Sequence, residues 1–460
     1  MRTLIAPPDA LRDGLAAIRA EYGVPAGFPP AVLAAAADAA ARPVPGGRAD
    51  RTERPFVTLD PAASTDLDQA FAIEAAGADL ILHYAIADVD VCVSDGDALD
   101  QEAWRRAETL YLPDGKAGLY PPAVSEAAAS LLPDGPRPAV VFTVRVAPDG
   151  TATLDGAEQA IVRSRAKLAY ETVTDADLPA GFAELAARVQ AAERARGAAR
   201  VDPPEQEVAA TADDFTLSFR PRLESEARNA ALSLCTNLAV AAALQAHGTG
   251  LFRVMPAPDA RAVARLRHTA AALGLDWPDA QPLEAFARGL AADDPKSAAF
   301  AVALRRAGSG ASYRPWRAGE VPWHAAVAAT YAHATAPLRR LADRYVIRAA
   351  LAVANGEAVP ETVTAAFERL PAVMARGDAV AGRISRAVID LAEAAVLRGR
   401  EGERFAAVVT DSDDHGARVQ LRDVAVAARL AERGLAAGEA VAVELVAADP
   451  VRRMVTFRRV

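Results

Sequence analysis

Residues 56–93 read FVTLDPAASTDLDQAFAIEAAGADLILHYAIADVDVCV, and this stretch decides the fold. Three of its segments, FVTL, AFAIE and LILHYAIADVDVCV, alternate apolar with other residues and are rich in β-branched types, which predicts β-strands. A Pro/Ala/Ser/Thr loop carrying aspartates separates the first segment from the second. The stretch therefore predicts a sheet in which an acidic loop joins two strands.

Outward from this stretch the chain alternates strands with long helices. A further strand, VVFTVRV, is expected at 140–146, and the middle of the chain reads as helical at 182–196, 224–246, 260–273, 282–291, 297–307, 339–355 and 361–400. Four short strands are expected at the end, at 404–411, 416–421, 440–449 and 454–460, which suggests a small OB-type barrel. The predicted class is α+β.

The composition limits the possible kinds of protein. The chain has 460 residues, of which 52% are hydrophobic, and a net charge of −9, which argues against a basic coat that clings to any nucleic acid. A basic channel inside an acidic shell stays possible because the relevant field is local. Only three of the 51 basic residues are lysines, at positions 116, 167 and 296. Arginine is the better residue for bidentate phosphate contacts.

The cysteines and the lengths of the apolar runs indicate where in the cell the protein is expected. Cys92 and Cys235 lie in apolar stretches and read as buried hydrophobes, so no disulfide-linked partner is expected. The first residues lack a secretory pattern, and no uncharged apolar run reaches 18 residues. We expect a soluble cytoplasmic protein that does not contact a membrane.

The acidic loop is the most informative local feature. Asp66 and Asp68 are two residues apart, so in extended backbone they point to the same face, and the loop can bring Asp60 back towards them. Clustered carboxylates repel one another, and a hard divalent cation such as Mg²⁺ or Mn²⁺ relieves that repulsion. Two other interpretations stay open: the aspartates could cap helices or form Asx-turns, or they could bind calcium, although the EF-hand glycine and distal glutamate are missing.

Taken in order, several blocks of the chain resemble the catalytic domain of the ribonuclease II and ribonuclease R family. The blocks are TLDPAASTDLDQA, YAIADVDVCVSDGDALDQEAWRRAETLYLP, SLLPDGPRPAVVFTVRVAPDG, SRAKLAYETV, LESEARNAALSLCTNLAVA, LFRVMPAPD and HAAVAATYAHATAPLRRLADRYVIRA. They fall within residues 52–400 and follow the family's order. The resemblance implies a large catalytic domain of the RNB type, with a mixed sheet and surrounding helices. It also implies a magnesium-dependent, processive 3′-to-5′ exoribonuclease that hydrolyses single-stranded RNA to nucleoside 5′-monophosphates.

The resemblance also assigns roles to the acidic loop. Asp60, Asp66 and Asp68 match the family's first three catalytic, metal-binding aspartates. The family's fourth aspartate is replaced by Gln69, whose amide oxygen is a neutral and weaker metal ligand. Tyr111 matches the family tyrosine that stacks near the 3′-terminal nucleotides, and stacking on an aromatic ring tolerates any base.

Further site residues come from three other blocks. Tyr170 matches a tyrosine near the sugar of the terminal nucleotide, where a 2′-hydroxyl contact distinguishes RNA from DNA. Asn237 matches the end of a helix in which the family usually has two glutamates, here replaced by Ala230 and Ala231. Without the resemblance, both tyrosines would read as half-buried core aromatics.

The motif YAHATAPLRR completes the predicted site. It supplies His333, Thr335 and Arg340 as RNA contacts and Arg339 as the group that steadies the scissile phosphate. Pro337 suits the first position of a helix, whose N-terminus would offer backbone donors to an anion. Read without the resemblance, the motif holds a solvated arginine pair and a hydrogen-bonded structural histidine.

The expected domains are a small helical module at 1–50, possibly of helix-turn-helix type, the catalytic domain at 52–400, and an RNA-binding OB barrel at 403–460. The protein is expected to act as a monomer on single-stranded RNA. Two alternatives stay open. One is an RNA-binding protein whose nuclease centre has decayed, suggested by Gln69, Ala230 and Ala231. The other, more remote, is a metal-dependent transferase acting on a nucleotide sugar.

Overall fold

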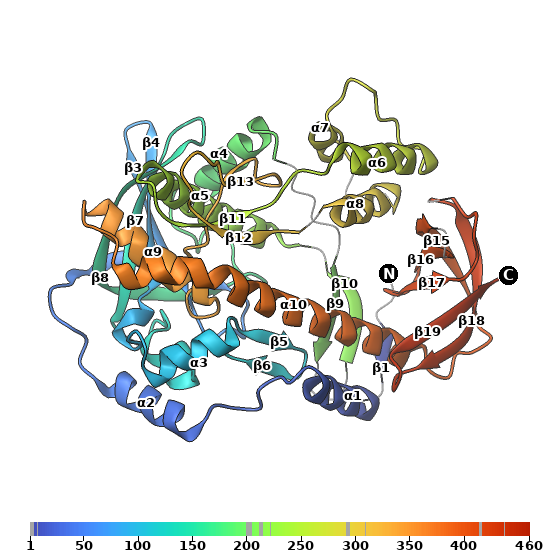
Figure 1. Cartoon of the computed structure of the whole chain (residues 1–460), viewed down its shortest axis with the longest axis horizontal. Helices are drawn as coiled ribbons and strands as arrows, with labels where there is room; N and C mark the ends of the chain where they lie inside the picture. The colour runs from blue at the N-terminus through green and yellow to red at the C-terminus, as the bar shows by residue number, and fades with distance from the viewer. Residues whose placement is uncertain are drawn as a thin grey trace.

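A computed structural model describes residues 4–6, 8–198, 205–210, 215–220, 222–290, 295–308, 310–413, 416–436 and 438–460. Figure 1 shows a large body on one side, a red sheet near the C-terminus on the other, and the long helix α10 (Glu361–Leu397) running between them. The predicted α+β class is confirmed.

The centre of the large body is a closed five-stranded barrel. Its strands in spatial order are β2 (Ala49–Asp60), β3 (Gln69–Ala76), β4 (Asp79–Ala87), β7 (Arg137–Val146) and β8 (Ala152–Ala169). Neighbouring strands are antiparallel except β2 and β8, which are parallel and close the barrel. The sheet is mixed, as predicted, but the sequence did not predict its closure or β8. The segment 89–91, expected as strand, is the short 3-10 helix η1 (Val89–Val91).

Helices pack with the barrel in one hydrophobic core. They are α2 (Pro30–Ala41), α3 (Ala98–Arg106), α4 (Phe182–Ala195), α5 (Glu224–Ala246) and α9 (Leu341–Ala354), with a π-helical turn at Val124–Ala128. Among the described helices, α5 is long and apolar enough to cross a membrane, yet 61% of its apolar window is buried inside the protein. Its contacts with α4, α9 and β8 are those of a core helix. Both cysteines are buried in this core.

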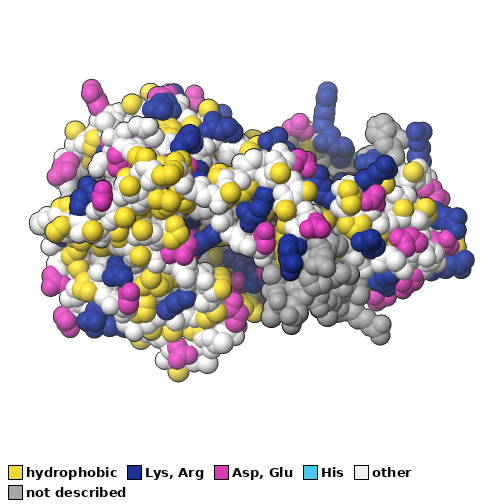
Figure 2. All heavy atoms as spheres, turned by 90° about the horizontal axis from the view of Figure 1, so that it is seen from below, with side chains coloured by type: hydrophobic (Ala, Val, Ile, Leu, Met, Phe, Trp, Pro, Cys, Tyr) yellow, Lys and Arg dark blue, Asp and Glu magenta, His cyan; other side chains and the backbone are white. Residues whose placement is uncertain are grey.

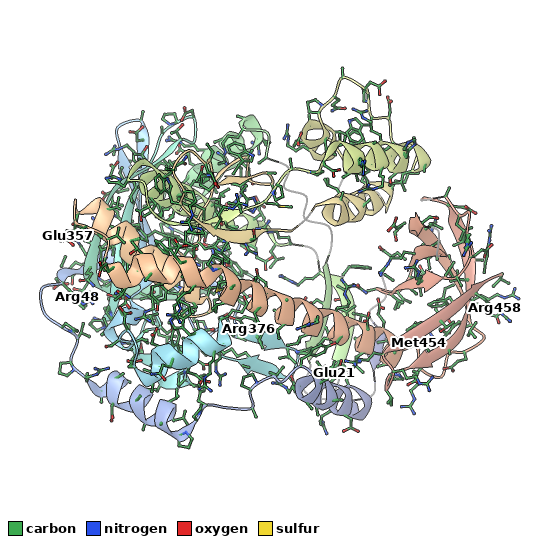
Figure 3. The ribbon with its side chains drawn as sticks, in the orientation of Figure 1. Glu21, Arg48, Glu357, Arg376, Met454 and Arg458 are labelled. Atoms are coloured by element: carbon green, nitrogen blue, oxygen red, sulfur yellow. The ribbon has the colours of Figure 1, made fainter. Side chains whose placement is uncertain are left out.

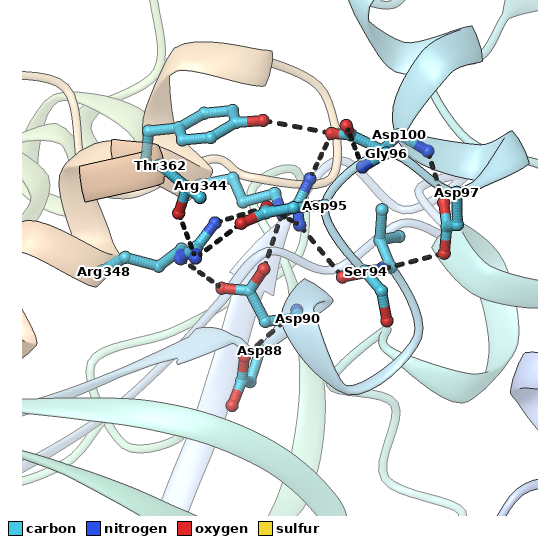
Figure 4. A network of polar contacts seen from close by, with 12 residues as sticks. Asp88, Asp90, Ser94, Asp95, Gly96, Asp97, Asp100, Arg344, Arg348 and Thr362 are labelled. Atoms are coloured by element: carbon cyan, nitrogen blue, oxygen red, sulfur yellow. Dashed lines mark hydrogen bonds and ion pairs between the residues drawn. The ribbon is translucent and has the colours of Figure 1, made fainter. Parts of the chain in front are cut away.

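A charged network joins α9 to the segment that follows β4, as Figure 4 shows. Arg344 of α9 is almost fully buried and binds three carboxylates, with nitrogen–oxygen distances of 2.6 Å to Asp90, 2.6 Å to Asp100 and 3.1 Å to Asp95. Arg348, one turn later, binds Asp95 at 2.6 Å. Buried carboxylates need such partners to stay charged. The acidic run after β4 is therefore structural, and it holds α9 in place.

The two N-terminal helices pack in different cores. The apolar residues of α2 belong to the barrel core, whereas those of α1 (Pro8–Glu21) belong to a second core with α10 and the C-terminal sheet. Figure 3 shows Glu21 at the end of α1 near Met454 of that sheet, and Glu21 forms an ion pair with Arg453. The first 50 residues thus supply one helix to each core, which is not a helix-turn-helix packing.

The C-terminal sheet has five strands in the order β17-β16-β15-β18-β19, and contacts between its first and last strands nearly close it. The strands are β15 (Arg404–Asp413), β16 (Gly416–Leu421), β17 (Ala427–Leu430), β18 (Ala440–Asp449) and β19 (Met454–Arg459). This agrees with the predicted OB-type barrel, of which the sequence missed the short β17.

The remaining elements are small. A third core joins α6 (Ala260–Ala272), α7 (Leu283–Arg288) and α8 (Pro295–Ala307), between the paired strands β11 (Leu251–Val254) and β12 (Ser312–Pro315). A three-stranded sheet joins β1 (Leu4–Ala6), β10 (Phe215–Arg220) and β9 (Glu205–Ala210). Two hairpins are formed by β5 (Leu110–Leu112) with β6 (Gly115–Ala117) and by β13 (Trp323–His324) with β14 (Ala329–Thr330). On the face seen in Figure 2, acidic and basic side chains are interspersed.

Candidate active site

The acidic loop lies at one end of the barrel. Asp60 is the last residue of β2, and Asp68 directly precedes β3, the neighbouring antiparallel strand. An antiparallel pair places the end of one strand beside the start of the next. The barrel therefore brings these two aspartates to the same end of adjacent strands, as the sequence predicted.

Asp68 is the most enclosed member of the loop. Its side chain is buried, and it accepts hydrogen bonds from the Leu338 backbone N–H at 2.7 Å and from Arg339 Nε at 3.2 Å. Burial raises the pKa of Asp68 to about 7, although the Arg339 guanidinium and the Leu338 amide oppose the rise. The carboxyl group is thus poised between its neutral and charged forms near neutral pH.

Asp60 lies in the same environment, but its carboxylate has fewer hydrogen-bond partners. Burial, and then the negative charge of Asp68, raise the pKa of Asp60 to about 7, with Arg339 acting in the opposite direction. Within the described residues, no hydrogen bond or ion pair reaches its carboxylate. A cation beside the two aspartates would lower both pKa values and remove the repulsion between them.

Asp66 is held by a hairpin that lies farther along the chain. Lys116 Nζ of β6 is 2.7 Å from Asp66 Oδ1 and 3.1 Å from Glu126 Oε1. Tyr111 of β5 pairs with Lys116 across the hairpin and is exposed by 56%. Partial desolvation and the nearby Asp66 carboxylate raise the pKa of Tyr111. The hairpin therefore places an open aromatic ring and an ammonium group beside the acidic loop.

The donor set fits a hard divalent cation, although the carboxylates do not form a closed cage. Across the described ranges, no group of three or more His, Cys, Asp and Glu side chains has a metal-binding arrangement. Two of the three aspartates are instead drawn to cations of the protein, Asp66 to Lys116 and Asp68 to Arg339. Carboxylate oxygens are ligands that suit Mg²⁺ or Mn²⁺. A cation bound there would lower the raised pKa values of Asp60 and Asp68.

The predicted metal role of Gln69 does not fit this geometry. Its amide oxygen accepts a hydrogen bond from the Tyr84 hydroxyl and another, at 2.9 Å, from Ser233 Oγ. These two bonds use both lone pairs of the oxygen. Because Gln69 begins β3, its side chain points away from that of Asp68, and it ties β3 to β4 and α5.

Tyr170 lies beside Asp60, where a terminal-nucleotide contact was predicted. Its backbone N–H donates to the Asp60 carbonyl at 3.1 Å, and its hydroxyl accepts from Asn229 Nδ2 at 2.8 Å. Asn229 also donates to the Leu59 carbonyl at 3.1 Å. Sequence reasoning missed Asn229, although it directly precedes Ala230 and Ala231 in the same block of α5.

The motif 331–340 forms a loop before α9, because α9 begins only at Leu341. Pro337 is therefore not the first residue of a helix, contrary to the prediction. The backbone donors are also committed to carboxylates: Leu338 N–H donates to Asp68, and the N–H groups of Thr335 and Ala336 donate to Asp343 at 2.9 and 2.7 Å. The predicted helix-terminus anion site does not fit this structure.

Four predicted RNA contacts lie inside this loop and its supports. Asn237 is buried and accepts a hydrogen bond from the Ala334 backbone N–H at 2.9 Å, while Thr335 is buried beside it. Arg340 binds the fully buried Asp343 through two nitrogens, at 2.8 and 2.9 Å. These groups hold the loop in its shape through buried contacts, so their role is to position it.

His333 is the fourth of these residues. Its Nδ1 is 2.7 Å from the Tyr313 hydroxyl, and burial and the surrounding arginines lower its pKa well below the usual value, so the ring stays neutral. Arg339 is different, because its side chain is 43% exposed and only its Nε is engaged with Asp68. Arg339 is thus the member of the motif that can reach a ligand.

Sequence reasoning also missed two charged residues of the site. Lys116 had a signal in its rarity, because only three of the 51 basic residues are lysines. The spacing of Asp343 was a second signal, because Asp343 follows Arg340 by three residues, about one helical turn. Neither signal shows which partner the side chain finds.

The structure thus has a closed mixed barrel with carboxylates and a partly exposed arginine at one end. The RNB domain profile matches residues 48–355, more than half of the chain, so the chain belongs to the RNB-domain family. The profile of the RNase II-type exonuclease C-terminal S1 domain matches residues 403–460.

Relatives agree with this family. Ribonuclease R of Aquifex aeolicus is 28% identical over 405 residues, which cover 82% of this chain and 56% of that protein. Exoribonuclease 2 of Yersinia enterocolitica is 39% identical over 130 residues, which cover 28% of this chain and 20% of that protein. The chain thus spans little more than half of one relative and a fifth of the other.

Solved structures share the fold. Mycoplasma genitalium RNase R in complex with ribose methylated single-stranded RNA has a TM-score of 0.88 at 18% identity, covering 98% of this chain and 78% of that one. The same protein in complex with double-stranded RNA has a TM-score of 0.85, covering 84% of that chain. The comparisons do not favour the alternative of a decayed nuclease centre.

Proposed function

We propose that this protein is a magnesium-dependent, processive exoribonuclease that hydrolyses single-stranded RNA from its 3′ end and releases nucleoside 5′-monophosphates. The observation that carries the proposal is the pair of enclosed aspartates, Asp60 and Asp68, beside the exposed Arg339. The names of the relatives support the same substrate and reaction.

Asp60 and Asp68 are the residues that would hold Mg²⁺, with Mn²⁺ as an alternative, whereas Asp66, the third predicted ligand, is engaged by Lys116. Bound there, the ion would supply a polarised water and charge stabilisation at a phosphodiester. The raised pKa of Asp60 and Asp68 supports this assignment, because both groups gain from a neighbouring cation.

The chain's own residues supply orientation and charge. The exposed guanidinium edge of Arg339 can bind the scissile phosphate while its Nε stays on Asp68. The open ring of Tyr111 can stack on a base, and the Tyr170 hydroxyl, which accepts a hydrogen bond from Asn229, can contact a sugar hydroxyl. Neither contact reads a base edge, so degradation should be independent of sequence.

The C-terminal sheet fits an RNA-binding role in this proposal. Such barrels grip single strands through a charged groove and aromatic rings. The two aromatics of the sheet, Phe405 and Phe457, are buried against each other, which favours backbone electrostatics over stacking. We propose a cytoplasmic location and a monomeric state as the simplest conditions for this activity.

The test is digestion of 5′-labelled single-stranded RNA with Mg²⁺, with excess chelator, and with the Asp68→Asn variant. The proposal expects a ladder of products shortened from the 3′ end only with wild type and Mg²⁺. A circular RNA of the same sequence should stay intact. Cleavage that survives chelation, equal cleavage by the variant, or cutting of the circle would contradict the proposal.

A further inference from the structure

The β5–β6 hairpin brings a lysine into the acidic site. Tyr111 and Lys116 are direct partners across the two strands, so their side chains share one face of the hairpin. That face meets Asp66 and Glu126, at 2.7 and 3.1 Å from Lys116 Nζ. The ammonium group therefore bridges two carboxylates that belong to different segments.

The chemistry of this bridge resembles that of a bound cation. A lysine ammonium is a compact charge with three donors, whereas a guanidinium spreads its charge over a planar fork. Lysine is scarce in the chain, yet two of its three lysines lie at the acidic loop: Lys116 at Asp66, and Lys167, whose charge opposes the rise in the pKa of Asp60. The third, Lys296, is exposed on α8, a helix of the third core.

The charges of the site can be balanced residue by residue. Four carboxylates, Asp60, Asp66, Asp68 and Glu126, face two cations in direct contact, Lys116 and Arg339. This leaves two negative charges, or one if the more distant Lys167 is included. One divalent cation brings the sum to zero, or to +1 with Lys167, whereas a second would bring it to +2 or +3. The neutral Gln69, whose oxygen is already hydrogen-bonded, adds no further charge.

We propose that Lys116 is a built-in cation that occupies the place of a second metal ion at Asp66, so that the site binds a single divalent ion through Asp60 and Asp68. The inference rests on the proposed function, since it concerns the same acidic site. Lys116 is a positioning residue here, because it acts through Asp66 and keeps that carboxylate and the Tyr111 hairpin in register.

The experiment counts Mn²⁺ ions bound to the full-length protein without RNA, by electron paramagnetic resonance of free Mn²⁺ during a titration. Wild type is expected to bind one ion at the site. Lys116→Ala removes the ammonium and should open a second site, giving two ions per chain, whereas Lys116→Arg should keep one. Lys296→Ala is the matched control and should behave as wild type.

Two results would overturn the inference: two ions in wild type, or one ion in a folded Lys116→Ala protein. If Lys116→Ala does not fold, Lys116→Gln keeps most of the side-chain length without its charge and decides the same question. Cleavage of labelled RNA is measured in parallel. One ion in wild type and two in Lys116→Ala without RNA cleavage would support the inference while the proposed function fails. If RNA is cleaved but Lys116→Ala binds the same number of ions as wild type, the inference about Lys116 fails while the proposed function stands.

Discussion

At the scale of single residues, the proposed RNA hydrolysis depends on one enclosed carboxylate. Asp68 contacts the Leu338 amide and the Arg339 guanidinium at once, so it connects the acidic loop with the arginine that we propose binds the phosphate. Asp68→Asn keeps the shape and removes the charge. We expect kcat for RNA hydrolysis to fall by roughly 100-fold or more, because a charged ligand and the partner of Arg339 are lost together.

The control for this prediction is Asp279→Asn, which changes a fully exposed aspartate near the third core. Its turnover should equal that of wild type. Steady-state rates with labelled RNA check both variants, and a loss of less than tenfold in Asp68→Asn would contradict the assigned role.

The raised pKa values of Asp60 and Asp68 make stability depend on pH. Each carboxyl has a pKa of about 7 in the folded protein and about 4 when unfolded, so between these values the folded state binds more protons. The stability gained from protonation is complete below about pH 4 and is lost as the pH rises through 7. We expect Tm of the metal-free protein to fall between pH 5 and pH 8, less steeply in Asp68→Asn.

Calorimetry at several pH values checks this slope, and added Mg²⁺ should recover Tm most at pH 8, where both carboxyls are ionised. A wild type and an Asp68→Asn variant with identical slopes would show that the buried charge is already neutralised in some other way.

Some residue roles could be predicted from sequence and others could not. Asp60 and Asp68 could be placed at the same end of neighbouring strands from the sequence, because a short loop joins β2 and β3. The contact between Asp66 and Lys116 of β6 could not be predicted in this way. The roles of His333 and Gln69 depend on Tyr313 and Tyr84, which lie 20 and 15 residues away in the chain. A motif names the residue but not its long-range partner.

At the scale of elements, α1 supports the hairpin that carries Tyr111 and Lys116. Arg19 of α1 binds Asp114 at the hairpin turn through two nitrogens, at 2.8 and 3.1 Å, and also donates to the Gly115 carbonyl. Gly115 has φ of 132°, a backbone conformation that disfavours other residues, so the turn has one defined shape. The N-terminal helix α1 therefore holds the β5–β6 hairpin in place beside the candidate active site.

Arg19→Ala should weaken catalysis more than stability. Since the ion pair is partly exposed, we expect a loss below about 1 kcal/mol in the free energy of unfolding. Misplacement of the hairpin should lower kcat/KM for RNA by roughly tenfold. Arg317→Ala, which removes a comparable bidentate pair with Glu368, is the control. Equal kcat/KM values for the two variants would refute the link between α1 and the site.

The loop before α9 depends on Asp343. This carboxylate is fully buried and accepts hydrogen bonds from two backbone amides and from Arg340. Asp343→Ala leaves a buried guanidinium unpaired, and we expect a loss of about 3–5 kcal/mol in the free energy of unfolding. Denaturant unfolding measures it. Glu403→Ala removes an exposed pair of the same i,i+3 spacing and should cost no more than about 0.5 kcal/mol.

Helices were easier to predict than strands. The helix expected at 224–246 has those bounds in the structure, because its apolar residues continue over many turns. The long strand β8 was missed, since its burial is irregular along its length and its partners are β2 and β7. The start of α9 was placed too early because Asp343 and Asp68 hold residues 335–338 as a loop.

At the scale of the whole molecule, the helix α10 connects the barrel with the C-terminal sheet. Its residues contribute to both large cores, and its last turns pack with α1 and the sheet. The sequence predicted the order of these parts. It did not predict that α1 packs in the second core while α2 packs in the barrel core. That contact joins residues from the two ends of the chain, which no local pattern reveals.

The most direct measurement of the central claim is the fate of water oxygen during RNA digestion. Single-stranded RNA is incubated with the protein and Mg²⁺ in H₂¹⁸O, and the released mononucleotides are analysed by mass spectrometry. The account predicts nucleoside 5′-monophosphates carrying one ¹⁸O in the phosphate for wild type, and no release by Asp68→Asn. Nucleoside diphosphates, 3′-phosphates, or equal release by the variant would contradict it.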